Sequence, residues 1–340
     1  MPQKDISRTE LLSAFHGLLQ PDHFKDYGPN GLQVEGRERI AHIVSGVTAS
    51  RALIDAAIEA KADAIFVHHG LFWRGQDGTV TGWMKQRLQR LLQHDINLIA
   101  YHLPLDAHPE LGNNAQLAQL WGLDVVSQFG DQNLGFMGQR KDGQAFSSAQ
   151  TLAELIAQTL GRTPTVVSQN PKPLQKIAWC SGGAQGYFED AIAAGADAFI
   201  TGEISEPQAH LARETGVAFL ACGHHATERG GAAAVGAHLA AEFGLRHEFT
   251  TGWNEVAGRA GNWLMDSNGV LITEPRTANS AFTTNNAKKL FAPRVSLAWD
   301  VFGNGKTAVR AGFGTYYTLI DNLAFLLNSI APYNGAVTYA

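Results

Sequence analysis

Two pairs of adjacent histidines are the residues of this chain whose type and spacing could do chemistry. They lie in Val67-His68-His69-Gly70 and in Gly223-His224-His225-Ala226-Thr227-Glu228, and each pair follows an apolar run that is typical of a buried strand. Adjacent side chains at the end of a strand point to opposite sides. One pair can therefore supply one ligand and one packing residue, or bind two different ions. Two such pairs in one chain favour two ions.

Carboxylates at matching spacing strengthen the metal interpretation. Asp106 lies four positions after His102, and Glu228 lies four positions after His224, so that two apolar strands each end in a His-x-x-x-acid unit. Imidazole and carboxylate groups are ligands that first-row divalent metals accept, and a carboxylate can bridge two ions. The spacing therefore predicts a metal site to which both of these units contribute.

Two copies of one strand and helix pattern carry these residues. Each copy has an apolar strand, a helix, a strand with an Ala-Asp-Ala signature, an amphipathic helix, and the strand that delivers the His-x-x-x-acid unit. The pattern predicts an α/β fold of two related lobes, with the site beyond the carboxyl ends of the strands, where the lobes face each other. Glu203 stands where His69 stands in the first copy. It either orients a ligating histidine or is an exposed polar strand end.

The chain also shows where its parts begin and end. The closing strand expected for the second lobe breaks off at His247-Glu248-Phe249. All thirteen histidines precede Thr250, but only six of the sixteen asparagines do. Both observations indicate a boundary near Thr250. We predict four parts: an N-terminal lobe at 1–129 whose helix and loop occupy 1–39, an inserted or linking segment at 130–175, a C-terminal lobe at 176–249, and a foreign β-rich tail at 250–340.

Composition limits the classes of function. The 340 residues are 45% hydrophobic, which is enough for a sizeable core, and the net charge of -5 gives no basic footprint for sequence-specific nucleic-acid binding. The two cysteines are too few for a disulfide framework. The N-terminus has no apolar signal region, and no stretch has the length of a membrane-spanning helix. We therefore expect a cytoplasmic protein with no membrane partner.

Five motifs in order resemble the NIF-three-like dinuclear-metal proteins, especially their bacterial YbgI-type members. The motifs are YGPNGLQVEG (27–36), VHHG (67–70), HLPLDAHPELGNN (102–114), TGE (201–203) and GHHATE (223–228). The resemblance covers about residues 9–249. It implies two metal ions between two α/β lobes, a toroidal homohexamer, and membership of the GTP cyclohydrolase I type 2 homologues.

The resemblance also implies roles for single residues. His68 and Asp106 are expected to hold one ion, His69 and His224 the other, and Glu228 to bridge both. His102 resembles an acid/base or orienting residue, and His225 a residue that supports a ligand. Zinc, iron, manganese and nickel all accept such ligands, so the identity of the two divalent ions stays open.

The expected function is hydrolysis of a small-molecule, nucleotide-type substrate. Two neighbouring cations lower the pKa of a water molecule and neutralise an anionic transition state. In a cyclohydrolase this water would attack C8 of a guanine ring, with His102 as the proton donor. Two alternatives stay open: a nucleotide phosphoesterase, or a hexameric binding or scaffold protein whose metals are structural.

The tail resembles a fragment of a different protein class. Residues 292–301 and 307–317 alternate as two strands about Gly303-Asn304-Gly305, and this resembles one hairpin of a TonB-dependent-receptor-like outer-membrane β-barrel. Three interpretations stay open: a join of two unrelated reading frames, which we favour, a decayed fusion, or an unrelated soluble β extension. In each case we expect the tail to supply no metal ligand and to pack poorly on the lobes.

Overall fold

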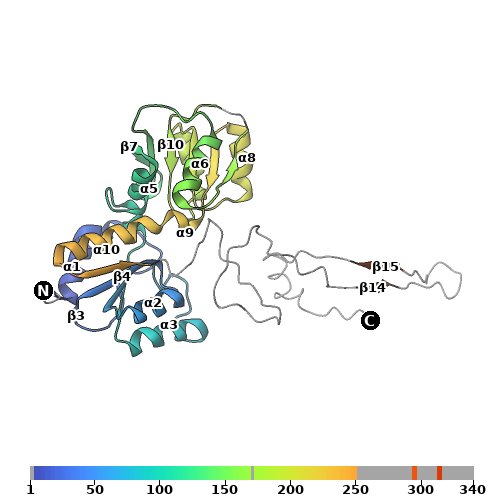
Figure 1. Ribbon diagram of the computed structural model, residues 1–340. Coiled ribbons are helices and arrows are strands. Elements are labelled where there is room, and N and C mark those ends of the chain that lie inside the picture. The colour runs from blue at the N-terminus through green and yellow to red at the C-terminus, as the bar shows by residue number, and fades with distance from the viewer. Residues whose placement is uncertain (1–3, 170–171, 251–292, 297–311, 316–340) are drawn as a thin grey trace, which may run out of the picture. The chain divides into compact units, whose positions relative to one another are not determined.

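A computed structural model of the chain describes residues 4–169, 172–250, 293–296 and 312–315. The chain divides into two units, residues 1–277 and 278–340. The first unit contains two mixed sheets with helices on their faces (Figure 1). The described residues of the second form an antiparallel pair of strands, β14 (Pro293–Ser296) and β15 (Gly312–Thr315). This pair falls on the predicted tail hairpin, whose Gly-Asn-Gly turn lies outside the described residues.

The first sheet has the strand order β13-β4-β5-β6-β2, with β2 antiparallel to β6 at one edge and the other neighbours parallel. Its strands are β2 (Gly31–Val34), β4 (His42–Thr48), β5 (Ala64–His69), β6 (Asn97–Ala100) and β13 (Arg246–Phe249). Nearly all residues of β4, β5 and β6 are buried. Continuous burial of this kind is typical of a parallel sheet that is covered on both faces.

Helices cover both faces of this sheet. Neighbouring side chains of a strand point to opposite sides, so they pack against different helices. Phe66 packs in one cluster with Phe15 of α1, whereas Ile65 packs in another with Leu53 of α2. A capping box between Ser7 and Glu10 begins α1. The surrounding elements are β1 (Ile6–Ser7), α1 (Arg8–Leu19), η1 (Pro21–His23), β3 (Arg39–Ile40), α2 (Arg51–Glu59), α3 (Gly82–Gln93) and α10 (Arg229–Phe243).

The second sheet has the order β7-β8-β10-β11-β12-β9, with a parallel centre of β10, β11 and β12. Ile200 packs on the face covered by α5 and α6, and Phe199 packs on the face covered by α7 and α8. The strands are β7 (Leu123–Phe129), β8 (Gly135–Arg140), β9 (Thr165–Val167), β10 (Ile177–Trp179), β11 (Ala198–Thr201) and β12 (Ala218–Ala221). The helices are α5 (Asn113–Trp121), η2 (Asp131–Asn133), α6 (Ala149–Leu160), η3 (Gln185–Tyr187), α7 (Phe188–Ala193) and α8 (Glu206–Thr215).

The α/β fold of two related lobes is confirmed, because β4-α2-β5-α3-β6 in the first sheet is repeated as β10-α7-β11-α8-β12 in the second. The strand at 246–249 differs from expectation: it pairs in parallel with β4 of the first sheet and does not close the second. The reason is that Val235 and Leu239 of α10 pack on the first sheet and bring the chain back to it.

Sheet membership also crosses the predicted boundaries. β7 precedes residue 130, and β8 and β9 lie in the predicted linking segment, yet all three strands belong to the second sheet. Sheet membership alone does not define domains, so the predicted division of the chain into parts at residues 129, 175 and 249 stays a prediction. In the described part of the chain, no helix is both long and apolar enough to cross a membrane.

Candidate metal centre

The carboxyl ends of two neighbouring parallel strands supply the first half of the site. His68 and His69 end β5, and His102 follows β6. A short helix, α4 (Leu103–Ala107), begins directly after His102 and carries Asp106 one turn later. Because β5 and β6 are paired in parallel, these side chains emerge at the same edge of the sheet.

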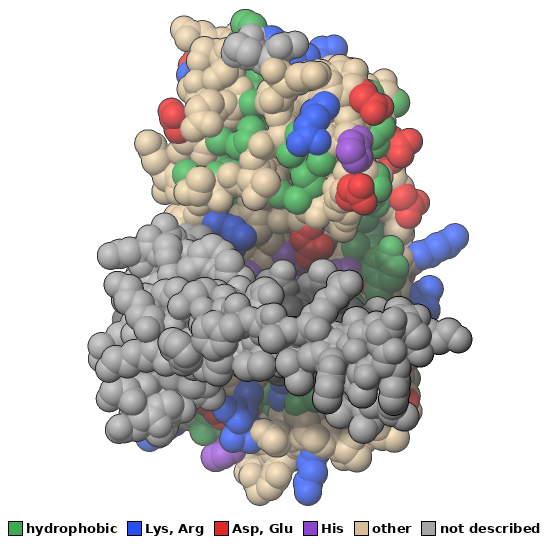
Figure 2. Space-filling model, turned by 90° about the vertical axis from the view of Figure 1, so that its right-hand side faces the viewer, with side chains coloured by type: hydrophobic (Ala, Val, Ile, Leu, Met, Phe, Trp, Pro, Cys, Tyr) green, Lys and Arg blue, Asp and Glu red, His purple; other side chains and the backbone are tan. Residues whose placement is uncertain are grey.

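The second half comes from the other lobe. His224 begins the short helix α9 (His224–Thr227), and Glu228 follows it at the start of α10. Gly223 permits the sharp entry into α9, since its φ of 96° is a conformation that side chains of L-residues disfavour. Figure 2 shows histidine and acidic side chains gathered in the recess between the parts of the first unit that carry the two sheets.

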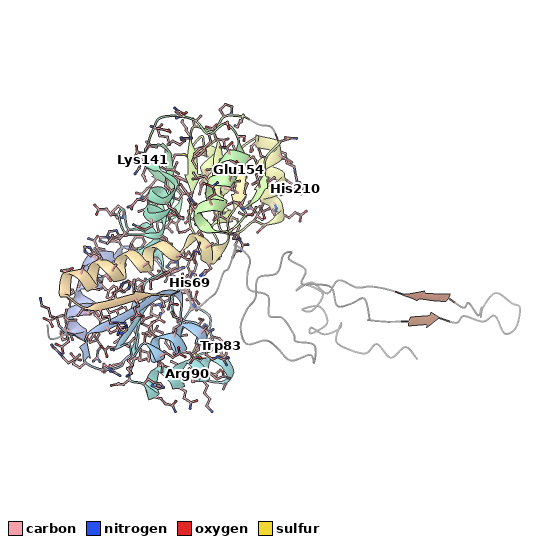
Figure 3. The ribbon with its side chains drawn as sticks, in the orientation of Figure 1. His69, Trp83, Arg90, Lys141, Glu154 and His210 are labelled. Atoms are coloured by element: carbon pink, nitrogen blue, oxygen red, sulfur yellow. The ribbon has the colours of Figure 1, made fainter. Side chains whose placement is uncertain are left out.

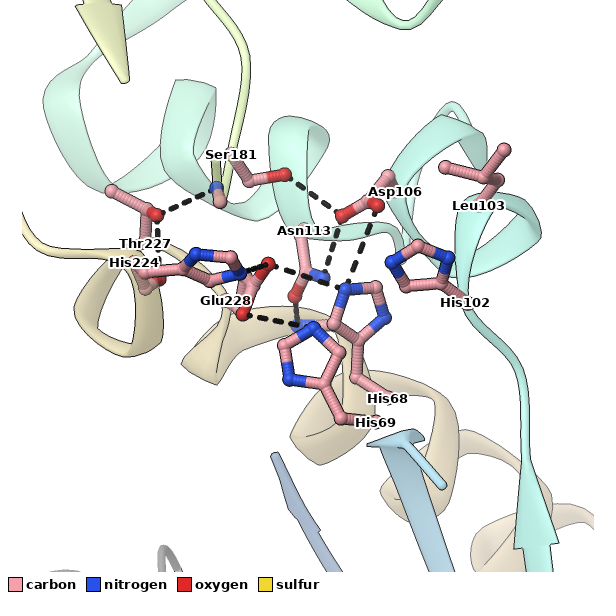
Figure 4. Close-up of polar contacts among 12 residues, drawn as sticks. His68, His69, His102, Leu103, Asp106, Asn113, Ser181, His224, Thr227 and Glu228 are labelled. Carbon is pink, nitrogen blue, oxygen red and sulfur yellow. Dashed lines mark hydrogen bonds and ion pairs between the residues drawn. The ribbon is translucent and has the colours of Figure 1, made fainter. Parts of the chain in front are cut away.

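All five predicted ligands lie in one cluster of overlapping groups (Figure 4). Glu228 lies at the centre: its Oε1 is 3.4 Å from Nε2 of His68 and 3.1 Å from Nε2 of His224, and its Oε2 is 3.6 Å from Nε2 of His69. Asp106 Oδ2 lies 3.5 Å from Nε2 of His68. The residues of both lobes are therefore close enough to share bound ions.

The cluster divides into groups that share a carboxylate. His68, Asp106 and Glu228 form one set whose ligand-type atoms lie within 4.8 Å of one another, and His69, His224 and Glu228 form a second. His102 joins a third set with His68 and His69. Its ring centroid is 4.9 Å from that of His68.

Burial and charge act together on the acidity of these groups. Burial lowers the pKa of His68, but the Asp106 and Glu228 carboxylates outweigh it and raise that pKa to about 9. The hydrogen bond to Glu228 raises the pKa of His224 to about 9. Burial and the neighbouring His68 lower the pKa of His69 to about 3. Burial opposes ionisation of Glu228, yet the positive His68 keeps its pKa well below the ordinary value.

Two buried atoms show that these residues fit a metal. The side chains of His68 and Glu228 are only 0% and 2% exposed. Among the described residues, Nε2 of His68 and Oε2 of Glu228 are buried and have no hydrogen-bond partner. An unsatisfied buried polar atom is costly, so such atoms call for a binding partner. A divalent cation satisfies imidazole and carboxylate lone pairs at once.

Two polar side chains hold Asp106 in place. Its Oδ1 accepts hydrogen bonds from Oγ of Ser181 at 2.8 Å and from Nδ2 of Asn113 at 2.9 Å, which leaves Oδ2 facing His68. Gly231 of α10 in turn donates its N–H to Oδ1 of Asn113. Sequence reasoning gave Asn113 and Ser181 no role, although Asn113 lies within a motif used for the resemblance.

Asp26 is a second residue that sequence reasoning missed. Its Oδ1 lies 2.7 Å from Nδ1 of His102, and its Oδ2 accepts the N–H of Leu103 and the amide of Asn30, each at 2.9 Å. Burial opposes its ionisation, but the hydrogen bond with His102 lowers the pKa of Asp26 overall. The signal that the sequence offered was the turn-forming Pro29-Asn30-Gly31, which follows Asp26 closely in the chain.

The two remaining predicted residues have different outcomes. Glu203 contacts a ligand candidate, since its Oε1 lies 2.7 Å from Nδ1 of His224, and this contact agrees with the orienting alternative. His225 also lies on α9, but it is in none of the sets of converging ligand atoms among the described residues.

Comparison with known proteins gives one family for most of the chain. Residues 6–254 match the model of Duf34/NIF3 (NGG1p interacting factor 3). A GTP cyclohydrolase 1 type 2 homolog of Neisseria meningitidis serogroup A is 53% identical over 240 residues, which cover 71% of this chain and 95% of that protein. One of Pseudomonas aeruginosa is 48% identical over 250 residues, covering 72% and 96%. The solved structure of protein ybgI, described as of unknown function, has a TM-score of 0.69 and 46% identity, covering 72% of this chain and 98% of that one.

The end of the chain matches a different family. Residues 234–340 match the model of an outer membrane beta barrel domain. This match begins within α10 and overlaps the first one by about twenty residues. The resemblance of the tail to an outer-membrane barrel protein is therefore confirmed at the level of sequence.

Proposed function

The chain belongs to the Duf34/NIF3 family, and from this membership we propose that it is a metal-dependent hydrolase with two divalent ions bound between its lobes. The observation that carries the proposal is that two buried atoms among five ligand-type side chains, His68 Nε2 and Glu228 Oε2, lack a hydrogen-bond partner. When bound, a pair of divalent ions lowers the pKa of water and neutralises negative charge in the transition state.

We assign the ligands from the two sets that share Glu228. His68 and Asp106 would hold one ion, His69 and His224 the other, and Glu228 both. Ser181 and Asn113 orient Asp106 by occupying its Oδ1. The same donor set accepts zinc, iron, manganese and nickel.

His102 is the residue to which we assign proton transfer. Asp26 accepts a hydrogen bond from Nδ1 of His102, so protons exchange with the substrate at Nε2. The Asp26 carboxylate also stabilises the imidazolium that forms when Nε2 takes up a proton. His102 can then deliver this proton to the departing nitrogen or oxygen of the substrate.

The names of the relatives suggest a nucleotide reaction. In GTP cyclohydrolysis of this type, one water adds to C8 of the guanine ring, the imidazole ring opens, and a second water releases formate. We propose this reaction class for the chain, together with a cytoplasmic homohexamer. A nucleotide phosphoesterase would use the same centre and the same proton donor.

The test combines elemental analysis with a screen of GTP, other nucleotides and phosphoesters in each metal form. Metal-dependent turnover that is lost in His102→Ala, with metal content retained, is the expected result. Protein that leaves GTP unchanged but hydrolyses another nucleotide or a phosphoester would remove the cyclohydrolase assignment and keep the hydrolase. If no metal form turns over any compound, the scaffold interpretation replaces both.

A further inference from the structure

A cavity of about 460 Å³ adjoins the candidate metal centre. Its lining joins His69, His102 and His224 of the cluster to side chains that the mechanism does not use. This volume lies within the range of small-molecule sites. A substrate that occupies this cavity would contact these additional side chains as well as the three histidines.

Aromatic rings are prominent in this lining. Tyr27 is 62% exposed and Trp83 is 56% exposed, although large aromatic side chains usually gain free energy by burial. Trp73 stands edge-on to His102, with ring centroids 5.1 Å apart and an interplanar angle of 89°. Aromatic side chains that line a cavity can stack planar rings, as they do with nucleic-acid bases.

A cation without an anionic partner lies beside these rings. Cζ of Arg87 is 4.8 Å from the centre of the Trp83 ring. Within the described part of the chain, Arg87 makes no hydrogen bond and no ion pair, and its burial lowers the pKa of the guanidinium. A partly buried guanidinium with free donors favours an anion, and its planar fork matches phosphate.

Arg90 shows what an ordinary arginine of the same helix does. Its Nε lies 2.7 Å from Oδ1 of Asp55, so its charge is already paired within the protein. Both Arg90 and Trp83 lie on α3 (Figure 3), but Arg90 does not line the cavity. An arginine stacked on tryptophan is also a common surface pair. What distinguishes Arg87 is that it lines the cavity that adjoins the candidate metal centre.

We propose that Arg87, held on the face of Trp83, is the anion-recognition residue of this cavity, and that the cavity selects a planar ring bearing a phosphate group. The ring lies against Trp73 beside His102, and the phosphate binds the guanidinium of Arg87. This inference rests on the proposed function, because it takes the cluster as the reacting end of the cavity. The substrate class is thereby narrowed to nucleoside phosphates, in preference to nucleosides or free bases.

Equilibrium binding tests this assignment without any need for turnover. The full-length, zinc-loaded protein would be titrated with GMP and with guanosine by calorimetry, in wild type, Arg87→Met and the matched control Arg90→Met. We expect Arg87→Met to weaken GMP binding roughly tenfold to a hundredfold, because it removes a charge-assisted hydrogen bond, and to leave guanosine binding unchanged. Arg90→Met should bind both compounds as wild type does, and all three proteins should contain the same amount of zinc.

Several results would overturn the assignment. One is an Arg87→Met variant that binds GMP as tightly as wild type does. Another is an Arg87→Met variant that loses GMP binding and guanosine binding equally. Wild type that binds neither compound would exclude nucleoside phosphates as the ligand class. These outcomes are separate from the hydrolase proposal, since that proposal fails on metal-dependent turnover in the wider screen and this one fails on binding.

Discussion

Asp26 and His102 form a hydrogen-bonded pair whose partners lie 76 positions apart in the sequence, with 2.7 Å between Oδ1 and Nδ1. The pair ties the loop before β2 to the end of β6, and Asn30 strengthens the tie by accepting the backbone N–H of His102 at 2.8 Å. With Nδ1 occupied, only Nε2 of His102 is available to a substrate. The orientation of His102, the proposed proton donor, therefore depends on a carboxylate that does not belong to the cluster of ligand atoms.

Replacement of this carboxylate should impair turnover without loss of metal. In Asp26→Asn the amide can donate to Nδ1 of His102, which favours the wrong tautomer, and it no longer stabilises the imidazolium. We expect kcat to fall by at least about tenfold with a smaller change in KM and an unchanged metal content. Asp22→Asn, at an exposed position of the same segment, is the control. Equal activity of the two variants would show that Asp26 does not position His102.

The division of ligands between two ions predicts different metal contents for two variants. Of the two sets that contain Glu228, His69→Gln removes a ligand from one, whereas Glu228→Gln alters the residue that both share. Elemental analysis should find about half of the wild-type metal in the first variant and little in the second. Glu242→Gln, an exposed position at the other end of α10, should keep full metal content. Loss of both ions in His69→Gln would contradict the assignment of ligands.

Local sequence predicted the parts of the site that lie at strand ends. An apolar strand followed by a ligand-type residue places that residue at the edge of a parallel sheet, as found for His68 and His224. The repeated Ala-Asp-Ala signature also has a structural basis. Oδ2 of Asp63 accepts the N–H groups of Ala41 and His42, and Oδ2 of Asp197 accepts those of residues 175 and 176 in the other lobe.

Contacts that depend on long-range pairing could not be predicted in the same way. Asp26 reaches His102 because β2 pairs antiparallel with β6, and no local pattern specifies that pairing. The strand at 246–249 joins the first sheet because α10 packs there, although it follows the second lobe in sequence. Ser181 reaches Asp106 only when the two lobes meet. Spacing along the chain carries no information about any of these contacts.

Gly182 should be required for metal binding although it offers no ligand. Its φ is 70°, and a Cβ atom there would lie 2.3 Å from Oε1 of Glu228 and 3.2 Å from Nε2 of His224. Gly182→Ala should displace the shared carboxylate, lower the metal content, and reduce the free energy of unfolding by about 1–3 kcal/mol. At Gly186 a Cβ would meet nothing within 4 Å, so Gly186→Ala is the matched control. Full metal content in Gly182→Ala would show that the cluster tolerates a shift of Glu228.

His247 should make the metal-free protein less stable in acid. Oγ of Ser45 lies 2.7 Å from its Nε2, and a Cβ at Gly236 would lie 2.4 Å from the same atom, so β13 and α10 enclose the ring closely. Burial, reinforced by the charge of His42 and opposed by Glu248, lowers the pKa of His247. The folded state therefore binds the proton less readily than the unfolded chain, whose histidine titrates near pH 6.5.

The sign of this effect follows from proton uptake. Above about pH 6.5 neither state protonates His247, and its contribution to stability is complete; below that pH the unfolded state takes up the proton first, so stability falls. Urea unfolding of chelator-treated protein at pH 8 and pH 5.5 should show a smaller acid loss in His247→Gln than in wild type. His69 and His108 also have lowered pKa values and contribute to the total loss, so the difference between the two proteins is the quantity to compare. An identical loss in both would mean that β13 does not hold His247 in its neutral form.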